Sequence, residues 1–507
     1  MKKLRESGPR DPGSEGVQGS ASLSMGRRQF LMGALAAGAS VASGVPRQNA
    51  DCCDGTLAYS GRPTSARSSA GRPNIVYVFS DTHRNCSWSG GGNPQVLTPN
   101  LDGMAGQGVT FTNCVSNFPL CSPYRACLLT GRYPQSNTVR TNVSPFHRGL
   151  PTSELSLARE LKDHGYQTGY VGKWHLYPGQ FEGVQVPAGP HRHGFDDYWR
   201  PCHNLIDRYR TRTFDDEGRV CTLASPAHGN YAPACQTDLA LSFIEANAEN
   251  PFCLFLSWDP PHPPYGGAPW RYLNRYNPFS LRMRENVPAS LNNIFVLWQL
   301  QGSYAHITAL DEQLGRILQS LDRLGIADNT IVVYTSDHGE MFGSQGQHNK
   351  EKPWEESVNV PFVIRWPAGI PGDRRLDTLF STVDIAPTLL GLAGLEAPAV
   401  MQGTDISGTL SGRGGPEPDE AFLMNIRGNQ DSQTNFIGDW RGVRTHRYTY
   451  VRHLLARTST PWLLYDNLED PQQRVNRVGD PSYASVRQEL ESRLNRSLDD
   501  QADTFGR

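Results

Sequence analysis

A cysteine followed at fixed spacing by a proline and an arginine carries the clearest chemical potential in this sequence. Cys121, Pro123 and Arg125 precede Gly131 in the stretch CSPYRACLLTG. Proline suits the first turn of a helix and glycine ends one, so the stretch predicts a helix with Cys121 at its N-terminus. Unpaired backbone N–H groups and the helix dipole favour an anion there, and Arg125 lies on the same face, suited to a tetrahedral oxyanion or a carboxylate. The alternative interpretation is a small buried cysteine that opens an ordinary helix.

Two aspartates follow predicted strands that are far apart in the chain. Asp81 comes after the apolar run 75–79, and Asp337 comes after the run 331–334. Both carboxylates would leave the same edge of a parallel sheet, where their repulsion raises one pKa unless a divalent cation binds between them. The alternative is that each aspartate caps a following helix.

The elements that must position these residues follow an alternating pattern. Continuous apolar runs at 75–79, 252–256 and 331–334 are typical of parallel strands covered on both faces. Helical spacing occurs between them, over 155–161 before Gly165 and over 304–324. The pattern predicts an open α/β sheet, whose ligands gather outside the carboxyl ends of the strands.

The pattern changes after about residue 400. The segments 448–451 and 462–465 predict antiparallel strands, and 483–494 predicts a terminal helix. We therefore expect a large domain over 72–400 that carries the site, and a smaller C-terminal α+β subdomain over 401–507.

Composition favours some classes of protein over others. The chain has 507 residues, 37% of them hydrophobic, and a formal net charge of −2, so it can bury a large core and gives no sign of binding nucleic acid. Ten cysteines are spread without the pattern of a disulfide framework. A bridge between Cys202 and Cys221 is one possibility.

The N-terminal segment predicts export rather than structure. The motif RRQFL at 27–31 precedes an Ala/Gly-rich apolar run that is too short to span a bilayer, as is typical of a twin-arginine signal. An amphipathic first helix is the alternative. We interpret 1–71 as a signal and flexible tether. We expect a periplasmic or extracellular protein with no stable membrane span.

The chain resembles the formylglycine-dependent (type I) sulfatases of the alkaline phosphatase superfamily. The stretch from Cys121 to Gly131 is similar to their C-x-P-x-R-x-x-x-x-T-G signature. Further similar blocks follow in order over roughly 73–475: PNIV before Asp81, TPNLD at 98–102, FTN at 111–113, GYVGKWH at 169–175, PHP at 261–263, SDHGE at 336–340, Lys350 ahead of Glu355, DIAPT at 384–388, LYD at 464–466 and DP at 470–471. The resemblance implies a large mixed, mostly parallel sheet sandwiched by helices, with a smaller C-terminal α+β subdomain.

The resemblance also implies a catalytic apparatus. Dedicated formylglycine-generating machinery would oxidise Cys121 to formylglycine, before export because the twin-arginine route carries folded protein. The hydrated aldehyde would attack a sulfate ester. The implied catalytic residues are Cys121, Arg125, Lys173, His175, His262 and Lys350. One divalent cation, expected to be calcium, would be held by Asp81, the modified Cys121, Asp337 and His338.

The family pattern assigns a task to each of these side chains. Arg125 would hold the hydrate, while Lys173 and Lys350 would neutralise the sulfate oxygens. His262 would protonate the departing alcohol, and His175 would accept a proton so that sulfate leaves. The alternatives are solvated surface lysines and structural histidines.

Three positions differ from the common pattern. Thr82 stands where many members carry a second aspartate, so a neutral oxygen would have to substitute at the metal. His338 replaces a common asparagine, and nitrogen is an unexpected ligand for a hard cation. Tyr124 replaces a frequent serine.

The favoured hypothesis is an exported sulfatase that cleaves an aryl or carbohydrate sulfate ester to alcohol and sulfate. One alternative is a phosphonate monoester or phosphodiester hydrolase with the same nucleophile, and another is a non-catalytic glycan-binding relative. The segment 266–296, rich in aromatic residues and arginine, could line a sugar subsite or serve packing.

Overall fold

The structure, a computed structural model, describes residues 71–203, 206–215, 218–289, 293–426, 438–455 and 458–506. The predicted export signal and all but the last residue of the tether lie outside the described residues. Within these ranges, no helix combines the length and apolar character needed to cross a membrane.

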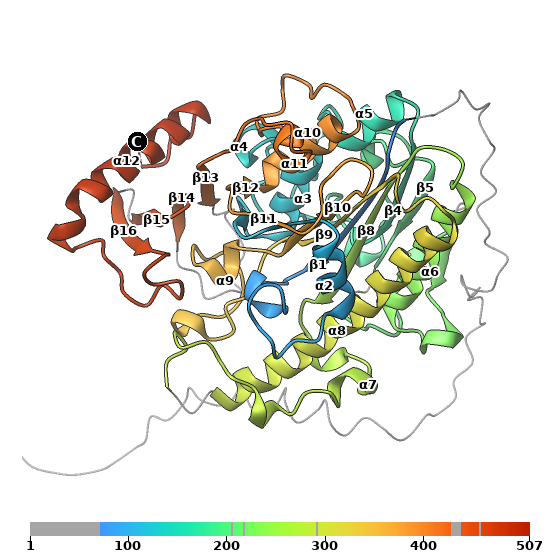
Figure 1. Cartoon of the computed structure of the whole chain (residues 1–507), viewed down its shortest axis with the longest axis horizontal. Helices are drawn as coiled ribbons and strands as arrows, with labels where there is room; N and C mark the ends of the chain where they lie inside the picture. Colours follow the sequence, from blue (N-terminus) through green and yellow to red (C-terminus); the bar gives the residue numbers. More distant parts are fainter. Residues whose placement is uncertain are drawn as a thin grey trace, which may run out of the picture. The chain divides into compact units, whose positions relative to one another are not determined.

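An eight-stranded sheet forms the centre of the described chain (Figure 1). Its order is β11-β2-β10-β9-β1-β8-β4-β5, and β10 alone runs antiparallel to its two neighbours. The strands are β1 (Asn74–Asp81), β2 (Val109–Phe111), β4 (Gln167–Gly172), β5 (Tyr198–Pro201), β8 (Phe252–Pro261), β9 (Thr330–Ser336), β10 (Phe362–Arg365) and β11 (Arg374–Leu376). Two small sheets pair β3 (Cys114–Val115) with β12 (Phe380–Ser381), and β6 (Arg212–Phe214) with β7 (Val220–Thr222).

Helices cover both faces of this sheet because its central strands are apolar on both sides. On β1, Ile75 and Tyr77 belong to one buried cluster and Val76 and Val78 to another. The first cluster includes residues of α3 (Cys121–Thr130), α5 (Leu157–Asp163) and α10 (Thr382–Leu392); the second includes residues of α2 (Pro99–Gly106), α6 (Ala232–Ala246) and α8 (Asn293–Arg323). Shorter helices are α4 (Pro134–Asn137), α7 (Trp270–Leu273), α9 (Glu355–Val358) and α11 (Ser407–Leu410). The predicted α/β sandwich is confirmed.

A second sheet follows near the C-terminus, where the sequence predicts antiparallel strands. It joins β13 (Glu420–Asn425), β14 (Asp439–Thr445), β15 (Tyr448–Leu455) and β16 (Thr458–Asp466) in that order, each antiparallel to the next. The amphipathic helix α12 (Ala484–Asp500) buries Leu490, Leu494 and Leu498 against it. Trp440 of this sheet donates to the Glu351 carbonyl at 3.0 Å, beside the site residue Lys350.

The parallel strands bring distant motifs to one edge. In the register of β1 with β9, Ser80 lies opposite Ser336, so Asp81 and Asp337 emerge side by side. Asp81 also lies opposite Pro261 of β8, the residue before His262. Strand β4 pairs with β8 and ends at Gly172, directly before Lys173. The sequence motifs therefore meet because their strands are adjacent and parallel.

The possible bridge between Cys202 and Cys221 is not formed. Cys202 is a free, buried thiol that accepts a hydrogen bond from Gln236 Nε2 at 3.2 Å. Cys221 is disulfide-bonded, and its partner is therefore a cysteine other than Cys202.

Candidate active site

Helix α3 places Cys121 at the floor of the site. The helix begins at Cys121 after Leu120 in an extended conformation, and ends at Gly131 in the left-handed region with φ 61°, as predicted. Cys121 is 1% exposed. Ser122 Oγ donates to the His175 carbonyl at 2.6 Å, which fixes this helix against the segment that carries Lys173 and His175.

Four potential metal ligands converge beside the helix N-terminus. Asp81, Cys121, Asp337 and His338 are all buried, and each offers a ligand atom within 4.8 Å of the others. His338 Nε2 lies 3.6 Å from Asp81 Oδ1, 3.5 Å from Asp337 Oδ1 and 3.4 Å from Cys121 Sγ. His338 Nδ1 donates to the Gly339 carbonyl at 3.0 Å, which leaves the lone pair of Nε2 directed at this cluster.

The charges of the carboxylates call for a cation. Burial raises the pKa of Asp337 to about 7, and the neighbouring Asp81 charge adds to this shift. Burial would also raise the pKa of Asp81, but Lys173, together with other cationic groups, holds that pKa well below its usual range. Two carboxylates and one imidazole nitrogen therefore form a donor set that fits a divalent cation.

Thr82 holds the two carboxylates in place. Its hydroxyl donates to Asp81 Oδ1 at 2.7 Å, and its backbone N–H donates to Asp337 Oδ1 at 3.1 Å. This β-branched residue has φ 73°, a conformation that costs about 1–3 kcal/mol and persists only where surrounding contacts require it. The Thr82 hydroxyl therefore contacts a ligand carboxylate, and a neutral oxygen that replaces the missing aspartate at the metal stays a prediction.

Arg125 binds the carboxylates and the neighbouring backbone. Its Nη2 lies 3.5 Å from Asp81 Oδ2 and 3.3 Å from Asp337 Oδ2, and its Nη1 donates to the Lys173 carbonyl at 2.6 Å. Nη1 also donates to Ser257 Oγ at 2.7 Å. The guanidinium therefore joins α3, β1 and β8 to the residues that directly follow β4 and β9, around the cysteine.

Two lysines flank the sulfur atom. Lys350 Nζ is 3.1 Å and Lys173 Nζ is 3.9 Å from Cys121 Sγ. Burial and the Asp81 carboxylate act to raise the pKa of the Cys121 thiol, but the two lysines and a hydrogen bond with His175 bring that pKa well below its ordinary value. The surroundings thus stabilise an anion at this position. In a modified chain, the sulfur atom stands for the oxygens of the hydrated aldehyde.

Burial separates the floor of the site from its mouth. Lys173 and His175 are 3% and 7% exposed, whereas His262 and Lys350 are partly exposed. Burial, Lys350 and Lys173 lower the pKa of His262 to about 4, against Asp81 and Asp259, which act to raise it. Burial likewise lowers the pKa of His175 to about 4, against a hydrogen bond with Cys121 that raises it. Both imidazoles are neutral at neutral pH before any ligand binds.

The structure adds two residues that sequence reasoning missed. Asp259 Oδ1 lies 3.1 Å from Lys173 Nζ, and its Oδ2 pairs with Arg208 Nη1. A charged residue at the end of an apolar strand, three positions before His262, was a usable signal for Asp259. Arg208 lies in a segment without a motif, and only the fold brings it near.

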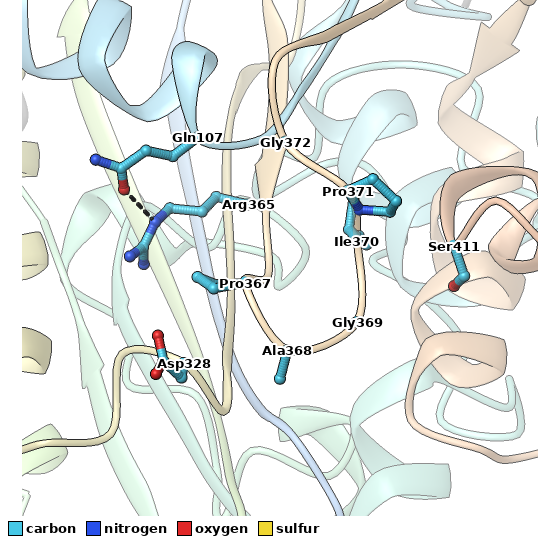
Figure 2. Close-up of a pocket in the computed structure, with 10 residues that line it drawn as sticks. All are labelled: Gln107, Asp328, Arg365, Pro367, Ala368, Gly369, Ile370, Pro371, Gly372 and Ser411. Carbon is cyan, nitrogen blue, oxygen red and sulfur yellow. Dashed lines mark hydrogen bonds between the residues drawn. The ribbon is translucent and has the colours of Figure 1, made fainter.

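The segment 266–296 divides between packing and surface. Tyr272 and Tyr276 are buried in a cluster with α8, which favours the packing interpretation for them, while Trp270 is 73% exposed. A separate hollow of about 600 Å³ lies beside Gln107 and Arg365 (Figure 2). Asp328 lines this hollow and precedes β9, whereas Asp337 follows β9. The hollow therefore lies at the opposite end of that strand from the candidate site.

The fold and the convergent charged residues define a hydrolase of the alkaline phosphatase superfamily, and comparison with known proteins makes this more specific. The sulfatase family model matches residues 73–395, and the model of the N-sulphoglucosamine sulphohydrolase C-terminal region matches 343–500. The chain belongs to the sulfatase family, and it is a sulfuric ester hydrolase.

Individual relatives cover most of the chain. An ulvan-active sulfatase of Formosa agariphila is 37% identical over 443 residues, covering 86% of this chain and 82% of its own. An N-acetylglucosamine-6-O-sulfatase of Bacteroides thetaiotaomicron is 26% identical over 501 residues, covering 83% and 85%. The solved structure of YidJ from Bacteroides fragilis has a TM-score of 0.78 at 27% identity, covering 87% of this chain and 98% of that one.

Proposed function

We propose that this sulfatase hydrolyses sulfate esters of carbohydrates, through a formylglycine made from Cys121 and beside a bound divalent cation. The names of both relatives support a saccharide substrate, since one acts on ulvan and the other on N-acetylglucosamine with a 6-O-sulfate. The observation that carries the proposal is the position of Cys121, at a helix N-terminus with Lys350 Nζ at 3.1 Å.

Formylglycine and the divalent cation would supply a nucleophile and a positive charge. A hydrated formylglycine would provide an oxygen nucleophile, and Asp81, Asp337 and His338 would hold a cation whose charge polarises the sulfate. Calcium is our proposal for that cation because carboxylate oxygens suit it. His338 adds a nitrogen donor, so manganese or zinc would be the first competitors to test.

The lysines and arginine of the chain would bind the sulfate group. Lys173 and Lys350 flank the nucleophile position and can neutralise sulfate oxygens as charge develops on them, which is worth about 2.7–4 kcal/mol per well-placed donor. Arg125 contacts both aspartates and would keep them and the nucleophile aligned.

The two histidines would move protons at opposite ends of the site. His262 is partly exposed at the mouth, where the alcohol must leave, so it is placed to donate a proton to that oxygen. Buried His175 lies on the nucleophile side, where it acts to lower the pKa of the Cys121 thiol, so it is placed to accept a proton from that side. The lysines lower the pKa of His262 before substrate binds. A bound sulfate anion offsets their charge, so we expect His262 to take up its proton together with substrate.

We also propose that the protein is exported by the twin-arginine route to the periplasm or beyond. The motif RRQFL at 27–31 supports this proposal, and the motif lies outside the described residues. Because this route carries folded protein, cellular formylglycine-generating machinery would have to modify Cys121 before the buried site forms.

The experiment compares three substrate classes on protein that carries formylglycine. Sulfated mono- and oligosaccharides, an aryl sulfate and a matched aryl phosphonate ester are incubated with the enzyme, and sulfate or alcohol release is measured. We expect the highest kcat/KM with a saccharide sulfate. Faster turnover of the phosphonate would instead support a phosphonate monoester hydrolase. Binding of sulfated glycans without turnover of any ester would support a non-catalytic relative.

A further inference from the structure

The Asp259 carboxylate joins a lysine of the active site to a buried arginine. Oδ1 lies 3.1 Å from Lys173 Nζ, while Oδ2 pairs with Arg208 Nη1. Asp259 is 3% exposed and Arg208 is 2% exposed. Arg208, followed by Lys173, lowers the pKa of Asp259 against the effect of burial, so this carboxylate is ionised at neutral pH. Lys173 also contacts Asp81 Oδ2 at 2.7 Å, so two carboxylates hold its ammonium from two sides.

The same arginine binds the backbone beside the proposed acid. Arg208 Nη2 donates to the His262 carbonyl at 2.7 Å and lies 3.4 Å from the Pro263 carbonyl. His262 Nδ1 donates to the Pro263 carbonyl at 2.9 Å, which leaves Nε2 as the nitrogen that faces a ligand. One guanidinium thus contacts both the carboxylate that holds Lys173 and the peptide groups that orient the imidazole.

Arg208 is itself fixed to the scaffold. Its carbonyl accepts a hydrogen bond from Ala232 N at the start of α6, at 2.8 Å. Tyr231, the residue before Ala232, makes a hydrogen bond of 2.7 Å with His306 Nδ1 on α8. Arg208 therefore links the His262 loop to two long helices, α6 and α8.

We propose that Asp259 and Arg208 are positioning residues that hold Lys173 and the His262 loop in register with the nucleophile, and that they serve chiefly the departure of the alcohol. The inference rests on the proposed function, in which His262 protonates the leaving oxygen. An ordinary buried ion pair is the competing explanation, and it predicts an effect on stability alone.

The two explanations differ in how the rate depends on the leaving group. A displaced His262 slows the hydrolysis of esters whose alcohol must be protonated, such as a saccharide sulfate. It matters little for 4-nitrophenyl sulfate, whose leaving group departs without a proton. Misplacement of a reacting group by about 1 Å costs about 100-fold, so we expect kcat/KM for the saccharide ester to fall by about that factor more than kcat/KM for 4-nitrophenyl sulfate.

The test uses the double variant Arg208→Gln/Asp259→Asn, because removing both charges avoids leaving one buried and unpaired. The matched control is Arg441→Gln/Asp503→Asn. Arg441 is 4% exposed, lies 2.6 Å from Asp503 Oδ2, and also donates to two carbonyls, of Asn425 and Trp440, in the C-terminal sheet. For each protein, kcat/KM is measured with both esters, and their ratio is taken within one preparation so that the fraction of active enzyme cancels.

We expect the ratio to fall about 100-fold in the Arg208/Asp259 variant and to stay at the wild-type value in the control. An unchanged ratio in the Arg208/Asp259 variant would overturn the inference. Arg208→Lys offers a milder third protein, since a lysine cannot make all these contacts at once, and its ratio should lie in between. Failure of the proposed function has a different signature, because the wild-type protein itself would then fail to hydrolyse the saccharide sulfate.

Discussion

At the scale of single residues, the cation site is built around two carboxylates that repel one another. Burial and the Asp81 charge raise the pKa of Asp337 from 3.8 to about 7. A carboxyl whose pKa is raised on folding stabilises the protein at low pH, and this contribution is lost as the pH rises toward 7. At pH 8 the ionised Asp337 therefore lowers the free energy of unfolding of the metal-free protein, and a bound cation would offset the repulsion between the two carboxylates.

We predict that Asp337→Asn abolishes stabilisation by a divalent cation. At pH 8, adding calcium at about 100 times its Kd should stabilise the wild-type protein by about 2.7 kcal/mol, seen as a rise in Tm, and leave the variant unchanged. Asp311→Asn is the control, since Asp311 is a buried carboxylate that accepts hydrogen bonds from the backbone of α2. An equal rise in Tm for Asp337→Asn would place the cation elsewhere.

At the scale of elements, the close approach of β4 to β8 sets the position of Lys173. Gly172, the last residue of β4, has φ 107°, and a Cβ there would lie 2.0 Å from the Ser257 carbonyl oxygen. Lys173 N donates to that same oxygen at 3.0 Å. Only glycine permits this geometry, so the strand end and the active-site lysine depend on a missing side chain.

Gly172→Ala should therefore lower both stability and kcat. The control Gly183→Ala has a similar φ of 91° with nothing within 4 Å of the added Cβ. In the control, stability should fall by only about 1–2 kcal/mol, because of the left-handed backbone conformation. Gly172→Ala adds a steric clash with the Ser257 carbonyl. Thermal unfolding and sulfate release are measured for both variants. Equal effects would show that the contact with Ser257 is unimportant.

At this scale, the sequence predicts the long apolar strands and the helix ends that nearby residues determine. The runs at 75–79, 252–256 and 331–334 became β1, β8 and β9, and the proline and glycine around Cys121 gave the bounds of α3. The short strands β5, β10 and β11 were not predicted, because three or four residues carry too little periodicity to reveal a strand. Helix α8 begins at Asn293, earlier than the predicted 304.

The residues of the site likewise divide into those that the sequence predicts and those that only the fold reveals. Residues inside recognisable motifs were found from sequence, and the fold brings them together at one sheet edge, although their roles remain predictions. Arg208 could not be found, because its contacts with Asp259 and the His262 carbonyl depend on the tertiary fold. The boundary between the two predicted domains at 400 also stays a prediction.

At the scale of the whole molecule, buried neutral histidines should make the protein sensitive to acid. Burial lowers the pKa of His306 to about 3, and it lowers the pKa of His83 and His193 to about 4. Below the ordinary histidine pKa of about 6.5 the unfolded chain binds protons that the folded chain does not. Stability should therefore fall as pH decreases from 6.5, by roughly 1.4 kcal/mol per pH unit for each such histidine.

His306→Gln is predicted to flatten this dependence. The amide cannot titrate and can still form a hydrogen bond with Tyr231, so the decline in unfolding free energy between pH 6 and pH 4 should be shallower by roughly 1.4 kcal/mol per pH unit. Denaturant unfolding at a series of pH values measures it, with exposed His446→Gln as the control. An identical slope in wild type and His306→Gln would mean that this histidine protonates without unfolding.

The central claim is that the cysteine at the start of α3 becomes the nucleophile. The most direct measurement is release of inorganic sulfate from a saccharide sulfate by wild type, Cys121→Ala and Cys127→Ala, all produced with formylglycine-generating machinery. Cys127 is a buried free cysteine on the same helix and serves as the matched control. The account predicts that wild type and Cys127→Ala release sulfate while Cys121→Ala releases none. Sulfate release by Cys121→Ala at the wild-type rate would contradict it.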